Sequence, residues 1–86
     1  MQDRVQVVLY TKPGCGLCQK MKGEMKNAGI DNLFTLVEVN IETDAELFAQ
    51  YRYEIPVLLI NGVEAFRHRL SADEFRIHVT SLLKTD

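Results

Sequence analysis

The order of elements in the first half of the chain constrains the fold more than any other feature. Residues 5–10, VQVVLY, form a β-branched and aromatic run that predicts a strand buried on both faces. A helix pattern follows from about Cys15, and residues 34–41 predict a second strand. Two strands joined in this way form a parallel pair with a right-handed crossover. The chain therefore begins with a β-α-β unit.

The first helix is predicted from apolar residues at helical spacing. Its stripe consists of Cys18, Met21, Met25 and Ala28. Gly29 is the expected end, because glycine adopts the left-handed C-cap conformation without strain.

Two capping boxes predict where the other helices begin. Thr43 as the N-cap, with Glu46 three residues later, opens a helix that fades by Tyr53. Ser71 and Glu74 open the last helix in the same way. The apolar stripe of this last helix is expected to consist of Phe75, His78, Val79, Leu82 and Leu83.

A β-hairpin is predicted between the last two strands. Asn61-Gly62, the strongest short hairpin signal, separates a strand over residues 56–60 from one over residues 63–67. Because the hairpin strands are antiparallel and the first pair is parallel, the sheet is mixed. We expect an α/β sandwich of a four-stranded sheet and three helices in the order βαβαββα.

Length and composition limit the other possibilities. A chain of 86 residues is one domain, 1–86, and 47% hydrophobic with 26% charged residues is typical of a globular protein. A net charge of -2 without a basic tract argues against nucleic acid binding. The apolar run over residues 5–9 is too short for a signal peptide or a membrane span. A cytoplasmic monomer with no membrane partner is expected.

Cys15 and Cys18 are the two cysteines of the chain, in a C-x-x-C at the carboxyl end of the first strand. A structural disulfide is disfavoured, because the cytoplasm keeps thiols reduced and the closed loop is short. Structural zinc needs about four ligands, and His68 and His78 do not match a zinc spacing. A buried cysteine is often an inert hydrophobe, but that explanation fits Cys18 alone and not the pair. The pair is therefore interpreted as redox-active.

The two sulfur atoms are expected to have different roles. The free N–H groups of the helix N-terminus and the cation of Lys12 favour a thiolate at Cys15. Gly14 and Gly16 leave this sulfur approachable, while Cys18 lies one turn further on the buried stripe. Cys15 is thus the predicted nucleophile, and Cys18 the residue that resolves the mixed disulfide.

The segments VVLYTKPGCGLCQKMK and YEIPVLLINGVEAF resemble a glutaredoxin-like protein of the thioredoxin superfamily over nearly the whole chain. The resemblance implies a thioredoxin-like fold with Cys15 as nucleophile and Cys18 as resolving cysteine. It also implies that Pro56 is a cis-proline facing the nucleophile. Lys12 would help to hold a glutathione carboxylate, and the backbone of Ile55 would pair with a bound thiol peptide.

The chain also departs from the glutaredoxin pattern. Gly16-Leu17 replaces the central Pro-Tyr of the common C-P-Y-C motif, and residues 66–71 lack the Gly-Gly that admits glutathione. Side chains in place of these glycines would obstruct the ligand. Arg67 and Arg69 either attract an anionic substrate or protect an exposed edge strand from pairing.

The predicted function is thiol–disulfide exchange, with no metal and no organic cofactor and with glutathione as one candidate co-substrate. The partner would be a disulfide-bearing protein or a low-molecular-weight thiol. Two alternatives remain open. Two chains could share a metal or an iron–sulfur cluster through Cys15, or the domain could be a binding module with little turnover.

Overall fold

The computed structural model describes residues 4–83. Residues 1–3 and 84–86, the two ends of the predicted domain, lie outside the described residues. The predicted order of elements is confirmed. They are β1 (Val5–Thr11), α1 (Gly16–Asn27), η1 (Asp31–Leu33), β2 (Phe34–Asn40), η2 (Ile41–Thr43), α2 (Ala45–Tyr51), β3 (Val57–Ile60), β4 (Val63–Arg67) and α3 (Ala72–Leu83), where η marks a short 3-10 helix.

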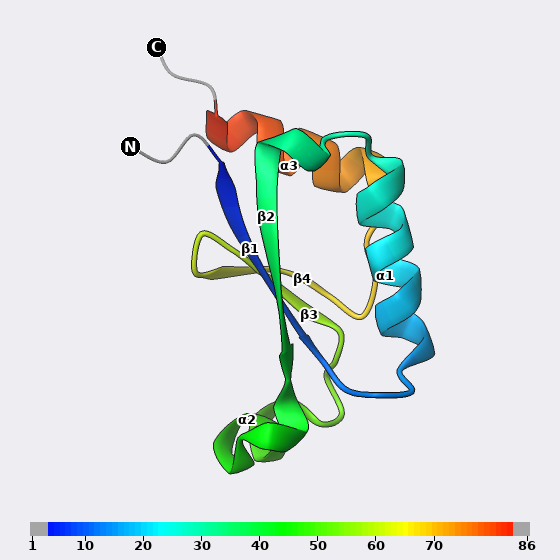
Figure 1. Ribbon diagram of the computed structural model, residues 1–86, viewed down its shortest axis with the longest axis vertical. Helices are drawn as coiled ribbons and strands as arrows, with labels where there is room; N and C mark the ends of the chain where they lie inside the picture. The colour runs from blue at the N-terminus through cyan, green and yellow to red at the C-terminus, as the bar shows by residue number, and fades with distance from the viewer. Residues whose placement is uncertain (1–3, 84–86) are drawn as a thin grey trace.

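The four strands form one mixed sheet in the order β2-β1-β3-β4 (Figure 1). β1 is parallel to β2 and antiparallel to β3, and β3 is antiparallel to β4. The first strand of the chain is therefore a central strand, with Val7 opposite Leu36 on one side and Ile60 on the other. Asn61 and Gly62 both have positive φ, 51° and 82°, as a tight hairpin turn between β3 and β4 requires.

The main core lies between the sheet and the helices α1 and α3. Its buried residues are Val5, Val7, Leu9, Met21, Met25, Ala28, Ile30, Phe34, Leu58, Ile60, Leu70, Phe75 and Val79. Two polar contacts join the helices: Ala72 N donates to Glu24 Oε1 at 2.9 Å, and Arg76 Nη1 donates to Ala28 O at 3.1 Å. The predicted α1 stripe is fully buried.

A second cluster lies beside α2, at the end of the sheet where β1 finishes (Figure 1). Cys18, Ile41 and Ile55 form its buried centre. Tyr10 and Tyr51 lie at its edge with ring centroids 4.9 Å apart. This cluster places α2 next to the C-x-x-C.

Two predicted burial patterns are wrong. β1 is not buried on both faces, because α1 and α3 cover only one of them: Val7 is buried and Gln6 is exposed. In α3, Leu82 is 46% exposed, because the side of the helix that faces the core carries Phe75, Val79 and the partly buried Leu83. Within residues 4–83, no helix has the length and apolar character needed to cross a membrane.

One of the two predicted capping boxes is also wrong. α2 is capped by Asp44, whose Oδ1 accepts hydrogen bonds from Glu46 N and Leu47 N at 2.9 and 3.1 Å. Thr43 instead closes the preceding 3-10 turn by donating its hydroxyl to Asn40 O at 2.8 Å. Because the hydroxyl of Thr43 is engaged in this turn, Asp44 becomes the N-cap of α2.

Candidate active site

The turn between β1 and α1 positions the two cysteines. Gly14 adopts a φ of +76°, a left-handed conformation that disfavours residues with a Cβ. Cys15 follows as the N-cap of α1 in an extended conformation, and Gly16 is the first helical residue. The local sequence thus places Cys15 where the N–H groups of the first turn have no partner within the helix.

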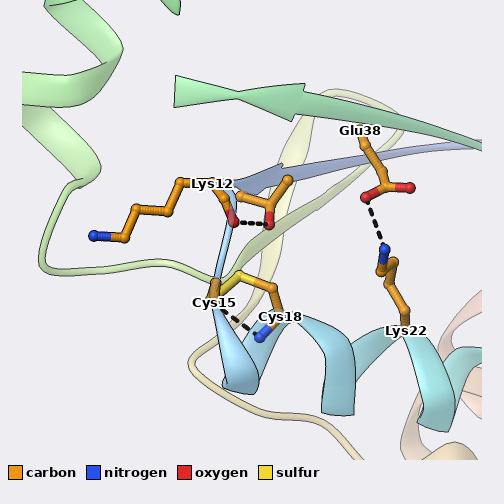
Figure 2. The surroundings of a disulfide bond; sticks show 6 residues. Lys12, Cys15, Cys18, Lys22 and Glu38 are labelled. Carbon is orange, nitrogen blue, oxygen red and sulfur yellow. Dashed lines mark hydrogen bonds and ion pairs between the residues drawn. A yellow bond between two sulfur atoms is a disulfide. The ribbon is translucent and has the colours of Figure 1, made fainter. Parts of the chain in front are cut away.

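Cys15 and Cys18 form a disulfide with their Cα atoms 5.2 Å apart (Figure 2). Cys15 Sγ also accepts a hydrogen bond from Cys18 N at 3.1 Å, so a sulfur atom caps the helix. The first turn of α1 contains no acidic residue. After reduction, the same N–H group and the positive end of the helix favour the thiolate form of Cys15.

The two cysteines differ in accessibility. Cys18 is completely buried in the cluster with Ile41 and Ile55. Cys15 is only half-buried and lies at the edge of that cluster. Its neighbour Leu17 is 51% exposed. A disulfide that approaches from solution therefore meets Cys15 first.

The loop before β3 lies against the same cluster. The Ile55–Pro56 peptide bond is cis, as the resemblance implied, and both residues are buried. His68 N donates to Pro56 O at 2.7 Å, which fixes this loop to the segment after β4. Ile55 N donates to Tyr51 O at 3.1 Å, so the pairing implied for the Ile55 backbone depends on its carbonyl oxygen.

Lys12 lies near the site but does not point into it. Its side chain extends away from the two sulfur atoms in Figure 2. Lys12 and Gly14 line a shallow pocket beside the turn, together with Gln19 and Asn40. The stabilisation of the Cys15 thiolate that we expected from Lys12 involves no contact in this conformation.

Arg67 forms an ion-pair network that the sequence patterns did not predict. Its Nη2 donates to Glu64 Oε1 at 2.7 Å, and its Nη1 donates to Glu54 Oε1 at 2.9 Å. The hydrogen bond with Glu64, followed by that with Glu54, raises the pKa of Arg67, and the hydrogen bond from Arg67 lowers the pKa of Glu64. Glu54 immediately precedes Ile55 and lies 13 residues from Arg67. It belongs to no sequence motif, so its pairing with Arg67 could not be recognised from the sequence. The charge of Arg67 is therefore compensated within the chain.

His68 and Arg69 are placed differently from Arg67. His68 has a φ of 72°, in the left-handed region that favours glycine, although its side chain is histidine. Both His68 and Arg69 line a groove against α1. Of the two arginines proposed to attract an anion, Arg69 is the one that faces this groove.

The fold and the cysteine pair define the class: this is a thioredoxin-fold protein with a C-x-x-C disulfide at the start of its first helix. Chloroplastic thioredoxin z has a similar fold, with a TM-score of 0.70 and 19% identity over 94% of this chain and 80% of that chain. A mutant thioredoxin from Halobacterium salinarum NRC-1 gives a TM-score of 0.69 and 13% identity over 98% and 79% of the two chains.

Family membership is more specific. The model of the glutaredoxin-like domain family (DUF836) matches residues 6–80, so the chain belongs to this family. A relative from Dictyostelium discoideum, described as "Glutaredoxin-like protein YDR286C homolog", is 28% identical over 86 residues. The match covers 93% of this chain and 80% of the relative. The resemblance drawn from the motifs is confirmed.

Proposed function

We propose that the protein is a thiol–disulfide oxidoreductase that cycles between a Cys15/Cys18 dithiol and the corresponding disulfide. The observation that carries the proposal is that the two cysteines differ in solvent accessibility and in hydrogen bonding. Cys15 is half-buried and accepts the N–H of Cys18 at 3.1 Å, whereas Cys18 is completely buried. Membership of a glutaredoxin-like family supports the same chemistry.

The reaction requires only the two cysteines and a disulfide substrate. The Cys15 thiolate attacks one substrate sulfur, so that a Cys15–substrate bond forms while the substrate disulfide breaks and its other sulfur leaves and takes a proton. Cys18 then attacks Cys15, forming the internal disulfide and releasing the second substrate thiol. Two electrons pass from the protein to the substrate, and a donor thiol returns them by the reverse sequence.

The proposal extends to the surroundings in which this cycle operates. A reducing compartment such as the cytoplasm would supply the thiol donor. The substrate would be a disulfide-bearing protein or a low-molecular-weight disulfide, handled by a monomer without an organic cofactor. The sulfur atoms themselves carry the electrons.

Single-cysteine variants test the proposal. Reduced wild-type protein should reduce insulin disulfides. Cys18→Ser should accumulate a mixed disulfide at Cys15 that mass spectrometry detects, and Cys15→Ser should accumulate none. The proposal is wrong if wild-type protein reduces no disulfide or if the trapped bond lies at Cys18. Metal bound in stoichiometric amount to the purified reduced protein would support the alternative metal-handling function.

The donor can be tested at residues 67 and 68. In glutaredoxins an acidic residue follows the Gly-Gly and completes the glutathione site, and residues 66–71 contain none. Loss of one such charge-assisted contact costs about 1.5–3 kcal/mol, or roughly one to two decades of affinity, so we expect weak use of glutathione. The double variant Arg67→Gly/His68→Gly should increase turnover with glutathione, because it clears the ligand path and suits the φ of 72° at His68. The double alanine variant removes the same charges but keeps both Cβ atoms, and it should give a smaller increase. Saturation of the wild-type protein by glutathione at ordinary cellular concentrations would contradict this expectation.

A further inference from the structure

A groove of about 590 Å³ begins at the C-x-x-C and runs along α1. Its other wall is the connection from β4 to α3, which passes alongside α1 in Figure 1. The lining includes Leu17, Lys20, Gly23 and Asn27 from α1, and His68 and Arg69 from the connection. Neither cysteine lines the groove, but Leu17, which lies between them in the sequence, forms its end, so the groove starts beside the C-x-x-C.

The charge of this groove is positive. Within the part of the chain that the structure describes, neither Lys20 nor Arg69 has an ion-pair partner. The carboxylate of Glu24 also lines the groove and accepts the hydrogen bond of Ala72 N at 2.9 Å, so two positive side chains stand against one negative side chain. Leu17 adds an exposed apolar side chain at the end next to Cys15.

Gly23 gives the groove an open floor. It lies in the interior of α1, where glycine lowers helix stability relative to alanine. A Cβ at this position would meet no atom within 4 Å, so packing does not require glycine. The missing side chain leaves the helix backbone open to close approach by a ligand.

We propose that the groove binds the segment of a protein substrate next to its reacting cysteine, with acidic side chains directed at Lys20 and Arg69. This proposal rests on the proposed function. The stretch from Leu17 to Asn27 is about 15 Å long at the helical rise per residue. An extended peptide advances about 3.3 Å per residue, so roughly four to five substrate residues fit along it.

Single-turnover rates with short peptides test the proposal. The Cys18→Ser variant is mixed with peptides whose one cysteine carries a pyridyl disulfide and is flanked on both sides by Glu, Gln or Lys. Cys15 attacks the peptide sulfur, the Cys15–peptide bond forms, and thiopyridone leaves and is measured by absorbance. The Glu peptide should react about threefold to tenfold faster than the Lys peptide at low salt, and the ratio should approach one at about 0.5 M salt. The net charge of -2 would by itself favour the Lys peptide, so this order requires local positive charge.

Charge variants locate the effect. Lys20→Gln combined with Arg69→Gln should remove the preference for the Glu peptide. Lys22→Gln combined with Lys26→Gln is the control, because it also removes two positive charges but from side chains that line a different pocket, with Asp31 and Leu36. Loss of the preference in the control, or its persistence in the variant that lacks Lys20 and Arg69, would contradict the proposal.

A second measurement does not depend on redox chemistry. The Glu peptide with Ser in place of Cys is titrated into isotope-labelled, oxidised protein, and the amide shifts of Gly23 and Leu70 should move. Gly23→Leu should abolish these shifts while keeping or raising the unfolding temperature, since leucine favours helix. If the three peptides react at equal rates and the amide shifts do not move, the proposed role of the groove is wrong and the proposed function stays intact. Groove shifts without any thiopyridone release would overturn the proposed function and leave the groove as a site that binds acidic peptides.

Discussion

The helices α1 and α3 have the same length, 12 residues, and cover the same face of the sheet, but their N-termini are built differently. At the start of α3, Ser71 Oγ accepts from Glu74 N at 3.1 Å, and Glu74 Oε1 accepts from Ser71 N at 3.3 Å. Glu24 on α1 satisfies the next N–H, that of Ala72. At the start of α1, the side-chain acceptor is the sulfur of Cys15, and no other is found among residues 4–83.

The difference shows how stability and reactivity compete at a helix N-terminus. Carboxylates in the first turn stabilise a helix because they face its positive end. In α1 the same carboxylates would repel a thiolate at Cys15 and compete for its N–H donor. The N-terminus of α3 is therefore capped in a way that stabilises the helix, whereas the positive end of α1 remains available to stabilise a thiolate at Cys15.

The largest expected effect is a difference between the two thiols of the reduced protein. The pKa of Cys15 should lie well below that of an ordinary thiol because of its N-cap position, and burial should keep the pKa of Cys18 high. Titration of the ultraviolet thiolate absorbance in Cys18→Ser and Cys15→Ser measures each group separately. A lower pKa at Cys18 would mean that the N-cap sulfur is not the activated one.

Removal of the hydroxyl cap from α3 should affect stability alone. Ser71→Ala should lower the free energy of unfolding by about 1 kcal/mol, because Glu74 N loses its acceptor. Urea denaturation measures this loss. The rate of Cys15 alkylation should stay unchanged, and a slower rate would show that the two helix ends are coupled.

Transfer of the α3 arrangement to α1 should trade reactivity for stability. Gly16→Asp places a carboxylate in the first turn of α1, where a Cβ meets no atom within 4 Å. In the reduced Cys18→Ser background, alkylation of Cys15 below its pKa should slow by about twofold to fivefold. Gly16→Asn, which is similar in shape and neutral, is the control. Equal rates for the two variants would show that charge at this position does not act on the sulfur.

The smallest expected effect concerns the segment that leads into α3. Arg67 lowers the pKa of Glu64 from 4.5, so the stability gained from this pair is present above that value and is lost as the pH falls through the lowered pKa. Arg67→Gln should therefore be less stable than wild type near neutral pH, and the difference should shrink in acid. Urea midpoints measured across this range test the expectation. The difference should be small because both side chains are exposed to solvent. A constant difference would mean that Arg67 acts mainly through packing.

Local signals in the sequence predicted most of the fold. Gly29 has the expected positive φ of 71°, Ser71 and Glu74 form the expected capping box, and the Asn61-Gly62 hairpin is present. Each of these depends on residues a few positions apart. Where two neighbouring residues can both cap a helix, as at Thr43 and Asp44, local rules do not decide between them.

The candidate site could be predicted only as far as its motif extends. The C-x-x-C placed Cys15 and Cys18 at the start of α1. The pairing of Arg67 with Glu54 and that of Glu24 with Ala72 could not be predicted, because the two residues of each pair lie 13 and 48 positions apart in the sequence. The groove between α1 and the β4–α3 connection likewise exists only once the tertiary structure has formed.

The central position of β1 has a consequence for synthesis on the ribosome. β1 is made first, and it can pair with β2 as soon as residues 34–40 have emerged. Its other edge stays unpaired until β3 arrives, since Val7 lies opposite Ile60. β1 therefore has strand partners on both sides only after more than half of the chain has left the exit tunnel. The last helix must follow as well, because Phe75 and Val79 complete the core.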